Sequence, residues 1–533
     1  MSVLRTSIDR GAPDFQRKRE AMLELIGQLD EVLADVRAGG GERYTQRHRE
    51  RGKLLPRERI ELLLDRDTAF LELSPFAAYD TQFTTGASVI TGIGVVEGVE
   101  CVIVASEATV KGGSQNPYSF RRAVRAMETA RVNRLPYIAL TESGGADLPT
   151  QAEIFVPGGA GFRRQAELSK DRIPNISVVF GNATAGGAYN PGMADYTVFI
   201  KERSKVFLGG PPLVKMATGE ESGDEELGGA EMHARVSGLG DYLAVDEPDA
   251  IRLARQIVRR LNWRKHGPGP SVLPVREPLH EIDDLCGIAS VDLKEPFDMR
   301  EVIARLVDGS DYDEFKPAYG TSLTTGWAAI HGFPVGILAN TQGILFSEEA
   351  QKATQFIQLS NQIDVPLLFL HNVTGYMVGA EYEQRGIIKH GSQMIHAVSN
   401  SEVPHISMVC GGSYGAGNYG MSGDGYLPRF NFVWPNAKIA VMGGAQLAGV
   451  LSIVARTAAE SRGQPYDEEA DAQLRAGVEQ MIESQSLALP MSGRVFDDGI
   501  IDPRDSRTVL GLTLSACHGS AIRGADAYGV MRM

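Results

Sequence analysis

The sequence has few cysteines, and none is placed to hold a metal or to build a disulfide framework. Four occur in 533 residues, and no CxxC pair is present. Zinc sites and disulfide scaffolds depend on paired or clustered cysteines. We therefore expect no metal in this chain and predict four reduced core residues: Cys101, Cys286, Cys410 and Cys517.

Long apolar runs and an excess of positive charge are also missing. No stretch of 18 or more apolar residues occurs, and the first twenty residues lack the apolar segment of a signal peptide. The net charge of −14 argues against a surface for nucleic acid or anionic membranes. We expect a cytoplasmic protein with no nucleic-acid or membrane partner.

Two common catalytic signatures are absent. No GxxxxGK[ST] loop occurs, so ATP binding in the P-loop manner is not expected. No GxSxG nucleophile elbow accompanies the histidines of the second half, His371, His390, His396 and His405, which we interpret as packed or surface residues. The acidic pairs Glu348-Glu349 and Asp497-Asp498 are interpreted as groups that cap or solvate helix ends and turns. What remains is chemistry carried by backbone dipoles.

The length predicts two domains of about 250 residues, because one core rarely grows larger. From Ala87 onward, strand-like segments alternate with helical ones, which favours an α/β fold. The Pro- and Gly-rich segment Lys265–Leu279 is interpreted as an interdomain linker. We therefore predict domains over residues 1–280, with an N-terminal helical extension, and 281–533.

Local patterns predict individual elements. The basic stretch Arg43–Arg59 is interpreted as a solvated, charged connection into a helix over Pro56–Leu64. A charged helical region is expected over Ala458–Gln485. Other predicted helices are Asp14–Val36, Ser119–Asn133, Gly161–Asp171, Ala250–Leu261, Met299–Leu306 and Ser347–Gln362. Predicted strands include Val89–Val96, Glu100–Ala105, Tyr137–Thr141, Ile176–Phe180, Pro366–Leu370 and His405–Val409.

One glycine-dense stretch occurs twice. Val403–Met421 runs from an apolar strand into a turn with glycines at 411, 412, 415, 417 and 420, and Ile173–Tyr189 is a looser version of it. The pairs Ile173-Pro174 and Val403-Pro404 are offset by 230 residues (404 − 174), and Leu135-Pro136 and Val365-Pro366 have the same offset. A repeat at one offset predicts two copies of one fold.

In each copy, two strands end in glycine-containing turns. The first copy has Ser143–Ala146 and Thr184–Gly187, and the second has Val373–Tyr376 and Tyr414–Gly417. Glycine has no Cβ, so a ligand can approach the backbone closely, and converging N–H groups stabilise an oxyanion. If the two strands are neighbours, each copy contains one oxyanion hole. The alternative is that the glycines only form turns.

The chain resembles, over nearly its whole length, the carboxyltransferase β subunit of biotin-dependent acyl-CoA carboxylases. Within this family, the sequence is most similar to the methylcrotonoyl-CoA and geranyl-CoA carboxylase branch. The residues that carry the resemblance are Arg51–Asp65, Ala108–Gly113, Ser143–Ala146, Ala185–Tyr189, Phe207–Lys215, Thr218–Glu220, Asn340–Gly379, Ser413–Met421, Met442–Gly444 and Asp497–Arg507.

The resemblance implies two tandem crotonase-like (ClpP-like spiral) domains. CoA thioester would bind the N-terminal domain and carboxybiotin the C-terminal domain, with the active site between two subunits of a homo-oligomer, usually a hexamer. The sequence contains no Met-Lys-Met biotin-attachment turn and no ATP-grasp domain. A separate α subunit with biotin carboxylase and biotin carboxyl carrier domains is therefore expected to supply carboxybiotin.

The resemblance also implies roles for the turns. The ureido oxygen of biotin would be held by N–H groups of Gly375, Tyr376, Ala416 and Gly417, and the biotin nitrogen would act as the base. The enolate oxygen of the acyl-CoA would lie against Gly145, Ala146, Gly186 and Gly187. Further substrate-binding residues are expected to be Lys111, Gly112, Gly113, Ala185, Tyr189, Lys389 and Tyr419.

The acyl group stays open. The propionyl-CoA-type branch has an acidic residue where this chain has Tyr419, which favours a branched or longer, α,β-unsaturated group. The loop Gly386–Gly391, however, is nearer the propionyl type. Two other functions remain as alternatives: the carboxyltransferase of a sodium-pumping decarboxylase, and a non-catalytic paralogue that holds a hexamer together.

Overall fold

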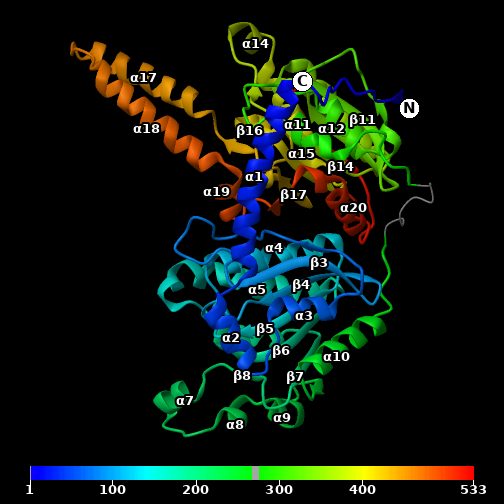
Figure 1. Cartoon of the computed structure of the whole chain (residues 1–533), viewed down its shortest axis with the longest axis vertical. Helices are drawn as coiled ribbons and strands as arrows, with labels where there is room; N and C mark the ends of the chain where they lie inside the picture. The colour runs from blue at the N-terminus through cyan, green and yellow to red at the C-terminus, as the bar shows by residue number, and fades with distance from the viewer. Residues whose placement is uncertain (1, 267–274) are drawn as a thin grey trace.

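The chain folds around two β-sheets, one in each half. A computed structural model describes residues 2–266 and 275–533, and Figure 1 shows the first half below the second. Most of the predicted linker Lys265–Leu279 lies outside these residues. In the described part, the first sheet has the order β2-β3-β4-β5-β6-β7-β9, with β8 paired to β6. Its strands are β2 (Phe70–Glu72), β3 (Val89–Val96), β4 (Val99–Ser106), β5 (Tyr137–Ser143), β6 (Asn175–Thr184), β7 (Tyr196–Ile200), β8 (Lys205–Phe207) and β9 (Tyr242–Ala244).

The second sheet repeats this order as β10-β11-β12-β14-β16-β17-β19, with β18 paired to β16 and β1 added at the edge. A small separate ladder joins β13 to β15. The strands are β1 (Ser2–Val3), β10 (Asp311–Glu314), β11 (Leu323–Ile330), β12 (Phe333–Asn340), β13 (Ile344–Leu345), β14 (Leu367–Val373), β15 (Gly375–Tyr376), β16 (His405–Tyr414), β17 (Phe430–Val433), β18 (Lys438–Ala440) and β19 (Gly499–Ile500).

Helices cover the sheets and cap their ends. Those of the first half and its N-terminal extension are α1 (Pro13–Arg37), α2 (Glu42–Glu50), α3 (Pro56–Leu63), α4 (Pro117–Asn133), α5 (Gln151–Lys170), α6 (Tyr189–Gly192), α7 (Pro211–Thr218), α8 (Asp224–Gly228), α9 (Ala230–Met232) and α10 (Glu247–Arg260). Those of the second half are α11 (Leu285–Ile288), α12 (Met299–Leu306), α13 (Ser347–Gln362), α14 (Ala380–Gln384), α15 (Ile387–Asn400), α16 (Gly415–Gly420), α17 (Gly444–Ser461), α18 (Glu468–Ser486), α19 (Ala488–Gly493) and α20 (Ser506–Cys517).

The pairing register confirms the duplication residue by residue. Tyr137 pairs with Asn175 where the parallel strands β5 and β6 begin, and Leu367 pairs with His405 where β14 and β16 begin. Both residues of the second pair lie 230 positions after those of the first. Since period and register agree, the two sheets are two copies of one fold, as the sequence predicted.

The two halves share apolar packing. One core cluster contains Val102 and Tyr137 from the first sheet together with Ile337 and Ile406 from the second. Helix α1 packs on α11 of the second half, and β1 pairs with β10. Of the N-terminal extension, β1 and α1 therefore lie on the second half, although they come first in the chain, whereas α2 lies against the first half (Figure 1).

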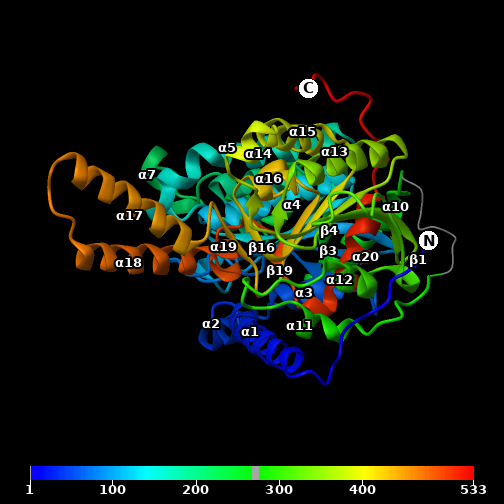
Figure 2. The same ribbon diagram turned by 90° about the horizontal axis from the view of Figure 1, so that it is seen from above.

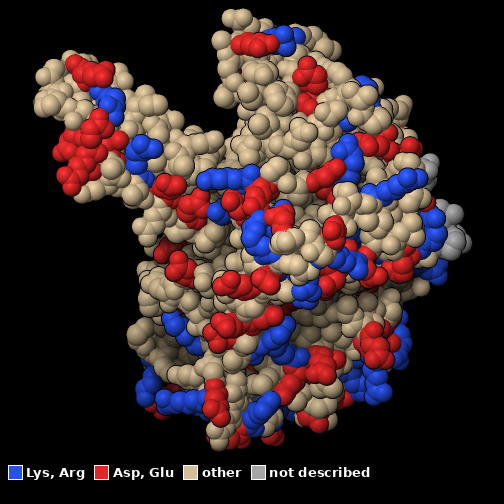
Figure 3. All heavy atoms as spheres, turned by 45° about the horizontal axis from the view of Figure 1, so that its top comes forward, with Lys and Arg blue, Asp and Glu red and all other residues tan. Residues whose placement is uncertain are grey.

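The predicted helical region Ala458–Gln485 covers only the last turn of α17, a short connection and nearly all of α18, and these two antiparallel helices pack on each other. They project from the second half as a hairpin (Figure 2). Acidic side chains gather on the hairpin (Figure 3), and the first turn of α18 contributes Glu468 and Glu469. Over residues 2–266 and 275–533, no helix is long and apolar enough to cross a membrane.

Candidate active site

The two glycine turns of the first half are brought together because β5 and β6 are neighbours. The register between these strands shifts between Thr141 and Ser143, which is the mark of a β-bulge. Gly145 follows with a φ of +96°, a conformation that L side chains rarely adopt. A Cβ on Gly145 would lie 3.2 Å from Thr184 O, so the two turns touch.

The second half repeats this geometry. The register between β14 and β16 shifts between His371 and Val373, again 230 residues further on. Gly375 has a φ of +139°, and a Cβ on Gly417 would lie 2.7 Å from Val373 Cγ2 and 3.2 Å from Gly375 Cα. Only glycine at position 417 permits this close approach.

In each half the two adjoining turns form a candidate oxyanion hole, called here the first and the second hole, and alternation along the backbone orients one N–H group of each. Gln115 N–H donates to Gly145 O and Asp147 N–H donates to Gln115 O, both at 2.8 Å. Successive N–H groups of an extended chain point to opposite sides, so that of Ala146 is turned away from Gln115. Met377 N–H likewise donates to Leu345 O at 2.9 Å, and the N–H of Tyr376 is turned the other way.

The other N–H groups of each hole come from the start of a short helical turn. In the first half this turn is Ala185–Ala188, and in the second it is α16. Ala185 and Gly415 occupy equivalent positions with φ of 53° and 52°. The first N–H groups of a helix have no acceptor inside it, which applies to Gly186 and Gly187 and to Ala416 and Gly417. Gly411 and Gly412, predicted in the turn, instead lie inside β16, which is five residues longer than predicted.

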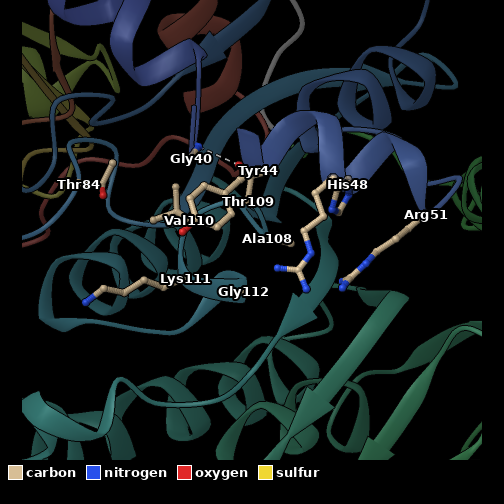
Figure 4. Close-up of a pocket in the computed structure, with 11 residues that line it drawn as sticks. Gly40, Tyr44, His48, Arg51, Thr84, Ala108, Thr109, Val110, Lys111 and Gly112 are labelled. Atoms are coloured by element: carbon tan, nitrogen blue, oxygen red, sulfur yellow. Dashed lines mark hydrogen bonds between the residues drawn. The ribbon is translucent and has the colours of Figure 1, made fainter. Parts of the chain in front are cut away.

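A basic hollow of about 340 Å³ lies next to the first hole (Figure 4). Its walls are α2, with Tyr44 and Arg47, the residue Arg51 that follows α2, and the segment Ala108–Gly112. Within the described residues, the guanidinium groups of Arg47 and Arg51 form no ion pair. Gly112 O accepts from Gly144 N–H at 3.1 Å, so the hollow and the first hole share one piece of backbone.

Aromatic rings flank both holes. Tyr189 and Phe162 pack edge to face with centroids 5.5 Å apart, and a Cβ on Gly186 would lie 3.8 Å from Phe162. The equivalent tyrosine, Tyr419, lies 5.8 Å from the ring of Tyr426. Both tyrosines are about half exposed.

Lys389 lies on α15, a helix the sequence analysis did not predict. This helix contacts the second hole through Gly391, whose Cβ would lie 3.2 Å from the Tyr376 ring. Lys389 itself is two residues from that contact.

The remaining histidines and cysteines behave largely as predicted. His371 and His405 are buried, and burial lowers the pKa of each to about 3. Burial also raises the pKa of all four cysteine thiols, which are free. Among the residues that the structure describes, no three His, Cys, Asp or Glu side chains are grouped so that they could hold a metal.

Two predictions about charged residues are wrong. Asp498 does not solvate a turn: it is buried and accepts from Arg125 Nη2 at 2.7 Å, across the junction of the two halves. The stretch Arg43–Arg59 is not solvated throughout, because Arg59 is only 1% exposed and forms ion pairs with Glu142 and Glu247. The sequence signal was the position of Arg59 beside Ile60 on the buried side of α3.

Known proteins are similar in sequence to this chain over its whole length. The carboxyl transferase domain family matches residues 47–524. A protein of Mycobacterium tuberculosis named probable biotin-dependent acyl-coenzyme A carboxylase beta2 subunit is 64% identical over 534 residues, covering all of both chains. The mitochondrial methylcrotonoyl-CoA carboxylase beta chain of Dictyostelium discoideum is 48% identical, covering all of this chain and 91% of its own.

Among solved structures, the beta subunit of geranyl-CoA carboxylase from P. aeruginosa is 44% identical and superposes with a TM-score of 0.91, covering 100% of both chains. The sequence similarity, the fold and the internal repeat therefore point to the same family. The chain belongs to the carboxyl transferase family, as the carboxyltransferase β subunit of a biotin-dependent acyl-CoA carboxylase built from two crotonase-like domains.

Proposed function

We propose that the chain moves CO2 from carboxybiotin to an acyl-CoA through an enolate whose charge is held by backbone N–H groups. The observation that carries this proposal is the presence of two equivalent holes, of which one adjoins a basic hollow. When bound, carboxybiotin supplies the CO2 and, through its ureido nitrogen, the base. The chain's own contribution is to bind, orient and stabilise charge.

The first hole is assigned to the acyl-CoA. Arg47, Arg51 and Lys111 border the hollow beside it, and cationic side chains suit the phosphate groups of CoA. The hollow is joined to the hole through Gly112 and Gly144, which would bring the thioester carbonyl to the N–H groups of Ala146 and Gly187. Lys111, Gly112, Gly113, Ala185 and Tyr189 would then line the path of the substrate.

The second hole is assigned to the ureido oxygen of biotin. Its N–H donors would be those of Tyr376 and Gly417. The neighbouring small residues Gly375 and Ala416 would let the ureido ring approach this backbone closely. The site is narrow, because a Cβ on Gly420 would lie 2.5 Å from Tyr376 Oη. A flat, uncharged ring system suits such a site better than a phosphate does. Lys389 and Tyr419 lie at its edge.

We also propose that the two holes of one active site belong to different subunits of a homo-oligomer, a hexamer by the resemblance. Large apolar side chains are exposed in both halves: Phe155 and Val156 on α5 of the first half, and Val378 and Ile388 of the second. Apolar surface of this kind suits an interface. The partner that carries biotin would be a separate α subunit.

The acyl group is proposed to be branched or α,β-unsaturated, similar to 3-methylcrotonoyl. This rests on the similarity to the Dictyostelium methylcrotonoyl-CoA carboxylase chain and on the aromatic wall of Phe162 and Tyr189. The methylcrotonoyl-type and geranyl-type relatives are both similar to this chain, so a panel of substrates is needed. Location in the cytoplasm stays a prediction.

The test is purification of the tagged chain from its own cells, followed by ATP-dependent fixation of labelled bicarbonate with a panel of acyl-CoAs. We expect a biotinylated subunit to co-purify and one branched or unsaturated acyl-CoA to be carboxylated. A complex that contains biotin but fixes label on no acyl-CoA would refute the proposal. Preference for propionyl-CoA would refute the assignment of the acyl group alone.

A further inference from the structure

Opposite the bulge of β6, strand β5 carries a charged side chain that the proposed mechanism does not use. We propose that Glu142, held by Lys53 and Arg59, is a positioning residue that fixes the aim of the first oxyanion hole. This inference rests on the proposed function of that hole. Glu142 is not among the residues assigned to either substrate, so its effect would pass through the backbone.

Glu142 lies at the point where the register of β5 shifts. The residues on either side of it, Thr141 and Ser143, pair with Val179 and Ala183 of β6, so the partner strand advances four residues while β5 advances two. Residues 180–182 of β6 thus oppose Glu142 alone, so β6 is the bulged strand, and a bulge bends the strand that contains it. Beyond this point β6 leads into Gly186 and Gly187 of the hole, and β5 leads into Gly145 and Ala146.

The side chain of Glu142 is held by two cations. Its carboxylate accepts from Lys53 Nζ and, at 2.8 Å, from Arg59 Nη1. The neighbouring strand leaves room for it, because a Cβ on Gly181 would lie 2.8 Å from Glu142 Oε1. Glu142 is 8% exposed, so solvent screens these contacts little.

Arg59 is fixed in turn by the body of the first half. Its Nε and Nη2 donate to both oxygens of Glu247 on α10 at 3.0 Å, a bidentate geometry. Its guanidinium lies 4.2 Å from the centroid of the Phe180 ring, next to Gly181. The clamp on Glu142 is therefore anchored to α3, to α10 and to the Phe180 ring of β6, all outside the glycine turns that form the hole.

The backbone of Glu142 is in contact with the substrate-binding turn. A Cβ on Gly113 would lie 2.3 Å from Glu142 O, and Ser143 Oγ donates to Gly113 O at 2.7 Å. Gly145 N–H donates to Ser143 Oγ at 3.2 Å. A shift of Glu142 would thus reach the hole through Ser143 and Gly145, and the turn beside the hollow through Gly113.

The second half provides an internal control. The equivalent of Glu142 is Asn372, and the equivalent of Gly181 is Gly411, whose Cβ would lie 2.5 Å from Asn372 Oδ1. Asn372 Oδ1 accepts from Gly412 N–H at 3.2 Å. In the described part of the chain no Lys or Arg pairs with it. Charge therefore holds only the first bulge.

The test uses the complex purified with its α subunit and compares the wild type with Glu142→Gln, which keeps the shape and removes the charge. We expect kcat for acyl-CoA carboxylation to fall about 10²-fold, the cost of a small misplacement, with a smaller rise in the KM for acyl-CoA. Release of CO2 from the carboxylated complex without acyl-CoA needs only the second hole, so its rate should not change. A variant whose two rates fall together would show a general structural role and overturn the inference.

Lys53→Met provides an independent variant if Glu142→Gln does not fold. It should lower kcat in the same way, and Lys53→Arg should restore most of it. Arg49→Gln, which removes only the exposed pair with Glu58, should retain wild-type rates. An active wild type with unchanged kcat in Lys53→Met would overturn this inference alone. A wild-type complex that carboxylates no acyl-CoA would overturn the proposed function, and this inference with it.

Discussion

The two halves bend equivalent strands in the same way but hold the bends by different means. Glu142 in the first bulge is held by cations, whereas Asn372 in the second is satisfied by a backbone N–H group. Backbone conformation has been kept through the duplication, down to the left-handed Ala185 and Gly415. Side chains have diverged, and the comparison suggests that the charged half was adapted to a charged ligand.

A second comparison on α4 and α13 shows the same trend. Arg122 and Lys352 are equivalent buried cations that both donate to backbone carbonyls, those of Val89 and Leu323 among them. Three residues later, Arg125 pairs with buried Asp498, whereas its equivalent Gln355 is exposed. Both halves thus have a buried cation under the strands, but only α4 of the first half adds a second cation, Arg125, that pairs across the junction.

The sharpest way to break the symmetry is Gly417→Val. The added side chain would clash with Val373 and Gly375, so we expect loss of carboxyl transfer by at least the roughly 10²–10³-fold that one missing donor costs. CoA binding in the first half should remain intact, as measured by isothermal titration. Gly187→Ala, the equivalent position, meets nothing closer than 3.9 Å and should have a much smaller effect. Equal loss of transfer and CoA binding would instead indicate a folding defect.

Arg125→Met tests the pair that only one half contains. It leaves Asp498 buried without its cation, and such a loss typically costs about 3–5 kcal/mol of unfolding free energy. Urea titration should show the loss as a lower midpoint. The matched control is Gln355→Met, which removes only an exposed contact with Lys316 and should be nearly neutral. Similar urea midpoints for the two variants would show that the Arg125–Asp498 pair does not stabilise the junction of the two halves.

Arg47→Gln and Arg51→Gln test whether the basic hollow of the first half binds the phosphate groups of CoA. Each should raise the KM for acyl-CoA about tenfold with little change in kcat, since hydrogen bonds to charged groups contribute about 1.5–3 kcal/mol. A thioester of pantetheine, which lacks the nucleotide phosphates, should be used equally well by variants and wild type. An equal rise in KM for both thioesters would show that the hollow does not bind phosphate.

The smallest expected effect is a pH dependence of stability, which Glu142 in the first half should cause and the uncharged Asn372 in the second half should not. Burial would raise the pKa of Glu142, but the charges of Arg59 and Lys53 outweigh it and lower the pKa below its ordinary value of 4.5. The stabilisation is therefore present above that value and lost as the pH falls through the lowered folded pKa. The difference in melting temperature between wild type and Glu142→Gln should shrink as the pH falls below 4.5. A difference that is constant with pH would argue against an ionised Glu142.

Much of this fold could be predicted from local pattern and repetition. Val89–Val96, Met299–Leu306 and Ser347–Gln362 match the structure at both ends, because each has clear periodicity and a clear stop. The fixed offset also located both pairs of turns. The burial of Arg59 could not be predicted, because its partner Glu247 is 188 residues away and the sequence around Arg59 shows only a charged segment. Helix α15 was missed because Gly386 and Gly391 weaken its pattern.

The pairing of β1 with β10 has a consequence for synthesis. Ser2 and Tyr312 are 310 residues apart in the chain. At ribosomal rates of about 5–20 residues per second, β1 and the apolar side of α1 wait roughly 15–60 s for their partners, while the first sheet can already close. During that interval Met22 and Ile26 of α1 lack the core that later buries them. The nascent chain thus has a period in which a holdase chaperone would find its target at the N-terminal helix.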